Sequence, residues 1–112
     1  MSIRQEKIAR AIQRDIAPIL GRYTQSILPG KLVTVVDVAA TADLGLAKVY
    51  VSIFGGEDRE KSLEIIRNNT KEIRHQLAQV IGKRIRKIPE LHFYLDTTLD
   101  HAEKIEGILK DI

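Results

Sequence analysis

Hydrophobic positions in the first part of the chain follow a helical rhythm. From about Arg4 to Thr24, apolar side chains recur three and four residues apart, which is the spacing of one buried helix face. They are Ile8, Ala11, Ile12, Ile16, Ile19, Leu20 and Tyr23. Pro18 lies inside this stretch and removes a backbone donor. We expect a bend at Pro18 rather than an end, because the periodicity continues beyond it.

Two alternating stretches come next and predict a hairpin. Leu28-Pro29-Gly30 is a turn signal, and β-branched residues then alternate between Lys31 and Ala40. A glycine-containing link leads to a second alternation in Ala47–Phe54, where Val49, Val51 and Ile53 share one side. Two such stretches joined by a short link are typical of antiparallel strands.

A second helical rhythm begins after Gly55-Gly56. Asp58 is a good N-cap, and the apolar positions Leu63, Ile66, Ile73, Leu77, Val80 and Ile81 keep helical spacing. The triplet Asn68-Asn69-Thr70 in the middle has low helix propensity. We therefore expect two helices that meet at a kink near Asn69, or one long bent helix.

The last part of the chain predicts a third strand and a trailing helix. Pro89 blocks helix continuation, and Leu91, Phe93 and Leu95 alternate with polar residues up to Asp96. A short final helix is expected from about residue 98. The predicted order is α-β-β-α-α-β, a single domain over 1–112 with a two-layer α+β sandwich. One sheet face should pack against the first helix and the central pair.

Charge along the chain is strongly uneven. Between Arg67 and Lys87 there are seven basic residues against one acid, a local charge of +6, although the whole chain carries only +3. Residues 88–112 hold six acids against two bases. Interleaved apolar residues place the basic stretch on a packed element, and its usual counterpart is a phosphate backbone. A solvated helix face is the plainer alternative.

The candidate phosphate-binding residues follow from this distribution. They are Arg67, Lys71, Arg74, Lys83, Arg84, Arg86 and Lys87 in the basic stretch, with Lys7, Arg10 and Arg14 of the first helix. The chain has few aromatic residues, and we expect Phe54 and Phe93 in the core. Many cations and few stacking groups favour recognition of folded RNA by shape and backbone.

Catalytic and metal-binding patterns are weak. The chain has no cysteine, and His75, His92 and His101 form no nucleophile arrangement by spacing. The acids near Asp96 are better explained as a turn and a helix start than as metal ligands. No phosphate-binding glycine motif, apolar signal core or membrane-length apolar segment is present. We expect a soluble cytoplasmic protein without cofactor or metal.

Four stretches of the chain resemble the ribosome-binding factor A family, which assists assembly of the bacterial small ribosomal subunit and cold adaptation. They are the opening helix Arg4–Ile16, the hairpin segments Val33–Val38 and Asp43–Ser52, the helix positions Ile73-Arg74 with Leu77-Ala78, and Arg86–Phe93 with Asp96. Each is weak alone, but their order and spacing together are specific.

The resemblance implies a type-II KH-like fold without the GxxG phosphate-clamping loop, and this sequence contains no GxxG. The family's Ala-x-Gly bend is replaced here by Asn69-Thr70-Lys71. The resemblance also implies a non-enzymatic factor that binds the 30S subunit and its 16S rRNA and assists late rRNA maturation. We expect a monomer with no membrane or small-molecule partner.

Two other function classes stay open. A nuclease acting on structured RNA would need an acid–base pair near the basic face, and Glu72 with His75 is the candidate there. A DNA-binding module would use the central helices as a helix-turn-helix, although the flanking strands speak against that arrangement.

Overall fold

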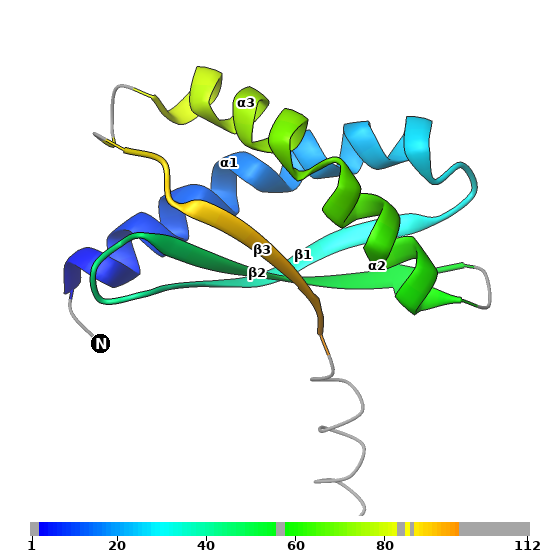
Figure 1. Ribbon diagram of the computed structural model, residues 1–112, viewed down its shortest axis with the longest axis horizontal. Helices are drawn as coiled ribbons and strands as arrows, with labels where there is room; N and C mark the ends of the chain where they lie inside the picture. The colour runs from blue at the N-terminus through cyan, green and yellow to red at the C-terminus, as the bar shows by residue number, and fades with distance from the viewer. Residues whose placement is uncertain (1–2, 56–57, 83–84, 86, 97–112) are drawn as a thin grey trace, which may run out of the picture.

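Six elements appear in the predicted order (Figure 1). The structure is a computed structural model that describes residues 3–55, 58–82, 85 and 87–96. The elements are α1 (Ile3–Ile27), β1 (Leu32–Ala40), β2 (Leu46–Phe54), α2 (Arg59–Asn68), α3 (Thr70–Ile81) and β3 (Glu90–Leu95). The expected final helix lies outside the described residues.

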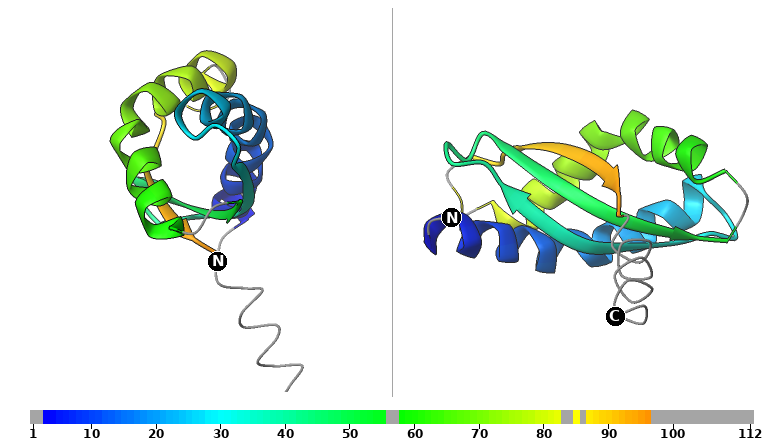
Figure 2. Two further views of the ribbon diagram at one scale, coloured as in Figure 1. Left: turned by 90° about the vertical axis from the view of Figure 1, so that its right-hand side faces the viewer. Right: turned by 90° about the horizontal axis from the view of Figure 1, so that it is seen from below.

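The sheet has the order β1-β2-β3. β1 and β2 form the predicted antiparallel hairpin, whereas β3 runs parallel to β2 after the α2–α3 crossover. All three described helices lie on one face of the sheet (Figures 1 and 2). This confirms the expected two-layer α+β sandwich of the type-II KH-like class.

The core lies between this sheet face and the helices. Val49, Val51 and Phe93 are at most 1% exposed and meet the buried stripe of α1 and α3, including Ile12 and Ile73. Alternation along β2 is regular, with the odd-numbered positions from 47 to 53 buried. In β1 the pairing shifts between Val35 and Asp37, so a bulge resets the alternation there.

α1 runs three residues further than predicted and continues through Pro18. Proline removes one helical hydrogen bond, but its ring lies on the exposed side of α1, where water can reach the freed carbonyl. The buried stripe on both sides of Pro18 keeps the helix against the sheet.

Two apolar residues that the sequence placed in the interior are exposed. Phe54 is 76% exposed and Val80 is 56% exposed, so the prediction of Phe54 as a core residue is wrong. Phe54 is the even-numbered neighbour of buried Ile53 and therefore faces away from the helices. Phe93 is in the core as predicted.

The kink between α2 and α3 falls at Asn69, as predicted. The Tyr23 hydroxyl of α1 donates to Asn69 Oδ1 at 2.8 Å, and Asn69 Nδ2 donates to the Ile65 carbonyl at 2.8 Å. Asn69 therefore satisfies a carbonyl near the end of α2 and also ties the kink to α1. At many helix ends a glycine with positive φ lets the backbone satisfy the last carbonyls. Here the side chain of Asn69 satisfies one of them instead.

Asn69→Ala should lower the free energy of unfolding by about 1–2 kcal/mol, because both side-chain hydrogen bonds are lost and a half-buried hydroxyl loses its partner. Urea melts measure this loss. Tyr23→Phe, alone and combined with Asn69→Ala, completes a double-mutant cycle for the pair. Additive losses would mean that the Tyr23–Asn69 bond does not couple α1 to the kink.

Candidate nucleic-acid interface

A shallow, cation-lined hollow lies between the α2–α3 kink and the start of β3. It encloses about 640 Å³, and its charged lining residues include Arg67, Lys71, Arg74 and Lys87. Gly45 of the β1–β2 turn also lines it. The fold thus gathers four of the ten predicted phosphate-binding residues around one surface feature.

The two arginines of this hollow also hold the edge strand. Arg67 donates through Nε and Nη2 to the Phe93 carbonyl at 3.0 and 2.8 Å. Arg74 donates to the carbonyls of Pro89 at 3.2 Å and Ile88 at 2.6 Å. A strand at a sheet edge leaves carbonyls without ladder partners. The Arg67 fork binds such a carbonyl within β3, and the Arg74 fork binds two carbonyls just before β3 begins. Each guanidinium keeps further N–H donors for an anion.

The two lysines are differently placed. Lys71 in the first turn of α3 and Lys87 just before β3 are both exposed, and neither has a hydrogen bond or ion pair with another described residue. The charge of Lys87 contributes to the lowered pKa of Asp43, but neither lysine is held by a hydrogen bond, so their ammonium groups are the cations of this hollow most available to phosphate oxygens. The sequence pattern treated all four cations alike, and the structure separates strand-holding arginines from available lysines.

The turn at 41–46 positions Gly45 beside this hollow. Asp43 Oδ1 accepts hydrogen bonds from the Gly45 amide at 3.0 Å and the Thr41 hydroxyl at 2.8 Å. The Gly45 amide and the Thr41 hydroxyl lower the pKa of Asp43 below its usual value. Gly45 in turn accepts from the Glu90 amide at 2.9 Å, so the hairpin turn is joined to the start of β3.

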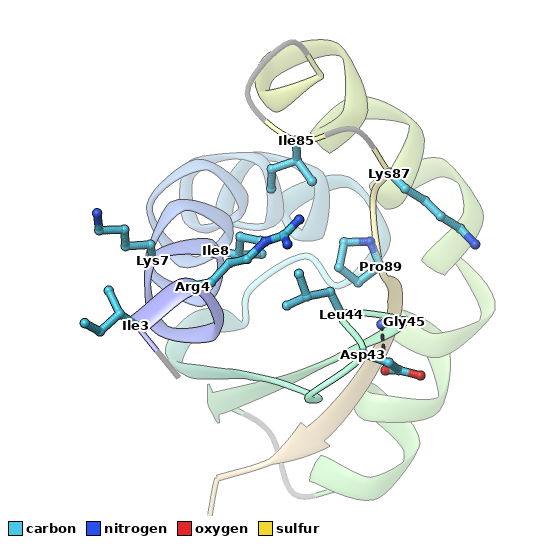
Figure 3. Close-up of a pocket in the computed structure, with 10 residues that line it drawn as sticks. All are labelled: Ile3, Arg4, Lys7, Ile8, Asp43, Leu44, Gly45, Ile85, Lys87 and Pro89. Carbon is cyan, nitrogen blue, oxygen red and sulfur yellow. Dashed lines mark hydrogen bonds between the residues drawn. The ribbon is translucent and has the colours of Figure 1, made fainter. Parts of the chain in front are cut away.

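A second hollow, of about 830 Å³, adjoins the first at Gly45 and Lys87. Ile8, Leu44 and Ile85 converge on it, while Lys7 and Lys87 point outward on opposite sides (Figure 3). Arg4 and Lys7 of α1 also line this second hollow, which therefore places two α1 cations next to the cation-lined hollow.

The predicted cations of α1 are mostly engaged with neighbours. Arg10 pairs with Asp37 of β1 at 3.0 Å, and Arg14 pairs with adjacent Asp15 at 3.1 Å. Hydrogen bonding and the charge of Asp15 raise the pKa of Arg14. Lys7 is exposed and has no such partner among the described residues. Of the remaining predicted residues, Lys83, Arg84 and Arg86 lie outside the described residues.

The described residues offer little for catalysis. Glu72 accepts from Gln76 at 3.4 Å, and His75 pairs with Gln79 at 3.3 Å, so each is bonded to a glutamine on the surface of α3. Within the described part of the chain, no group of three or more His, Cys, Asp or Glu residues could hold a metal ion. Nor is any helix there long and apolar enough to cross a membrane.

Sequence reasoning did not single out a tyrosine pair on the other face of the sheet. The rings of Tyr50 and Tyr94 lie 5.8 Å apart between centroids, with an interplanar angle of 31°. The Arg67 guanidinium lies 5.7 Å from the Tyr94 ring centroid, within cation–π range. Alternation alone places Tyr50 opposite the buried side of β2, but the contact with Arg67 requires the tertiary fold.

The fold and this surface define a KH-like α+β protein whose paired helices and edge strand present a cationic hollow. The chain belongs to the ribosome-binding factor A family, because the model of that family, described as "Ribosome-binding factor A", matches residues 4–109.

Curated relatives support the same membership. The chain is 45% identical to ribosome-binding factor A of Chlorobium luteolum, over 100% of this chain and 93% of the relative. It is 40% identical to that of Flavobacterium psychrophilum, over 95% of this chain and 82% of the relative.

Solved structures share the fold. The crystal structure of ribosome-binding factor A from Thermus thermophilus matches with a TM-score of 0.67 and 22% identity, covering 81% of this chain and 94% of that one. A homology model of the Thermus thermophilus factor, fitted into a cryo-EM map of a 30S complex with that factor, matches with a TM-score of 0.59 and 25% identity, covering 78% and 93%.

Proposed function

We propose that this chain binds the small (30S) ribosomal subunit and its 16S rRNA through the cation-lined hollow and assists late rRNA maturation. The observation that carries the proposal is the convergence of Arg67, Lys71, Arg74 and Lys87 around one hollow in a chain of this family. A related factor fitted into a 30S complex supports the choice of partner. Action in the cytoplasm and a role in cold adaptation belong to the same proposal.

The chemistry of the hollow favours binding to an RNA backbone without catalysis. Arginine forks and lysine ammonium groups bind phosphate oxygens, and such contacts position a protein without reading sequence. Arg67 and Arg74 are fixed by the carbonyls they hold, which reduces the ordering cost when an anion binds. Lys71 and Lys87 supply adaptable charges, and Lys83, Arg84 and Arg86 stay predicted contributors.

Replacing Lys71 and Lys87 together with glutamine should weaken 30S binding by about ten- to a hundredfold at moderate salt, because two phosphate contacts are lost. Co-sedimentation with purified 30S subunits measures the affinity. Both side chains are exposed, so a urea melt should change little. These lysines are a better choice than Arg74, whose replacement would also release the edge strand.

The matched control removes two positive charges elsewhere. Arg22 in α1 and Lys61 in α2 are exposed and line neither hollow, so Arg22→Gln with Lys61→Gln should leave affinity within about threefold. Equal loss in both double variants would reveal a dependence on net charge alone. Full affinity of the Lys71/Lys87 variant would refute the hollow as the rRNA contact.

A further inference from the structure

The sheet face opposite the helices carries a row of side chains that the proposed backbone contacts do not use. Even-numbered positions of β2 point to this face, since the odd-numbered ones are buried, and no described helix covers it (Figure 2). Tyr50 pairs in register with Tyr94 of β3 and with Asp37 of β1. Arg67 lies at one end of this row, and Arg10 at the other.

Both tyrosines are half-buried. Their ring planes are tilted by 31° from one another, so the pair is tilted and lies closer to parallel than to an edge-to-face contact. No described helix covers the pair, so among the described residues its half-buried rings keep part of their π surface accessible. Aromatic side chains on open sheets are a common platform for unpaired bases.

Charges around the pair favour a polyanionic partner. Lys48 lies on the same face one row away and pairs in register with His92. Asp37 forms an ion pair with Arg10 at 3.0 Å, and Glu90 lies 3.2 Å from His92. Lys48 and Arg67 are therefore the cations beside the tyrosines on which an anionic partner would depend.

Arg67 connects this face to the cation-lined hollow. Its side chain lines the hollow and a small depression with Tyr94, and its guanidinium lies 5.7 Å from the Tyr94 ring centroid. An RNA strand whose phosphates lie in the hollow can cross the edge of β3 at Arg67. Its next bases then reach Tyr94 and Tyr50.

From this placement we infer that the open sheet face binds an unpaired RNA segment, with bases stacked on Tyr50 and Tyr94. The inference rests on the proposed RNA binding and extends it from backbone contact in the hollow to base contact on the sheet. Base stacking on aromatic rings is tolerant of sequence, so the segment is recognised as single-stranded rather than by its bases.

Tyrosine fluorescence gives a direct test, because the chain has three tyrosines and no tryptophan. In a Tyr23→Phe background the two remaining tyrosines are those of the open face. Titration with a single-stranded oligouridine of about 10 nucleotides, corrected for RNA absorption, should quench their emission. Duplex RNA of equal length and heparin, a polyanion without bases, should quench much less.

Substitutions of the pair provide the second readout. Tyr50→Leu with Tyr94→Leu should weaken oligouridine binding by about tenfold, while Tyr50→Phe with Tyr94→Phe should stay within about twofold because the rings remain. Circular dichroism and urea melts check that both variants fold. Sedimentation of the free protein shows whether a second copy covers this face instead, which would overturn the inference.

The two proposals fail separately. Equal oligouridine affinity of the folded leucine variant, or equal quenching by heparin, would overturn base stacking even if 30S co-sedimentation persists. If the unsubstituted protein does not bind 30S subunits, the proposed function is overturned, regardless of its affinity for oligouridine. Neither double variant keeps a tyrosine on this face, so their affinities are measured with a fluorescently labelled oligouridine. Oligouridine affinity that falls in the leucine variant and persists in the phenylalanine variant supports stacking on the sheet.

Discussion

Replacing Phe93 with alanine should lower the free energy of unfolding by about 3–5 kcal/mol, because the ring is 1% exposed and its removal leaves a cavity in the core. The total free energy of unfolding of a domain of this size is only about 5–15 kcal/mol. The unfolded fraction should therefore rise sharply on warming. Denaturant melts of the variant, followed by circular dichroism, measure the loss.

Phe54→Ala is the matched control for this prediction. The same ring is removed at a position that is 76% exposed, so the expected loss is below about 0.5 kcal/mol. Similar losses in the two variants would contradict the assignment of faces in the sheet.

The Phe93 variant should also affect RNA binding indirectly. The Phe93 carbonyl accepts both hydrogen bonds from Arg67, so movement of β3 around a cavity would displace a cation of the hollow. We expect weaker 30S binding than the stability loss alone explains, measured at a temperature where the variant is still folded. If the folded Phe93→Ala variant binds 30S subunits with unchanged affinity, the position of the Arg67 side chain does not matter for binding.

The affinity for 30S subunits should fall on the order of a thousandfold between about 50 and 200 mM salt, if about six phosphates are contacted. The physical cause is the release of condensed counterions from the RNA when lysine and arginine replace them. A co-sedimentation series across salt concentrations gives the slope of log affinity against log salt.

The Lys71/Lys87 glutamine variant tests whether the hollow accounts for part of this slope. Each lost phosphate contact should reduce the slope by about one, so the double variant should be shallower by about two. The Arg22/Lys61 control should keep the full slope. Affinity that does not change with salt would contradict an electrostatic interface.

Several features of the fold were predictable from the sequence because they depend on local periodicity. The stripe around Ile12 and Ile16 predicted α1, and alternation around Val49 and Val51 predicted β2. Capping by Asp58 and the break at Asn69 also follow from residue type, since side-chain oxygens compete for backbone donors near their own position.

The bulge in β1 and the exposure of Phe54 were not predictable from these patterns. Alternation of apolar and polar residues predicts that a strand has two faces. It does not predict where an extra residue in β1 shifts the pairing with β2. An aromatic residue at a strand end is apolar by type, and only the position of the helices over the opposite face leaves Phe54 in solvent.

The candidate interface divides in the same way. The sequence by itself determined that seven cations fall between Arg67 and Lys87, because charge is a property of residue type. Only the tertiary structure decided their separate roles: Arg67 and Arg74 bind carbonyls of residues 14–26 positions away, while Lys71 and Lys87 have no such partner among the described residues. Those partners depend on the angle at which α2 and α3 meet β3, which packing of the whole core sets and no local pattern encodes.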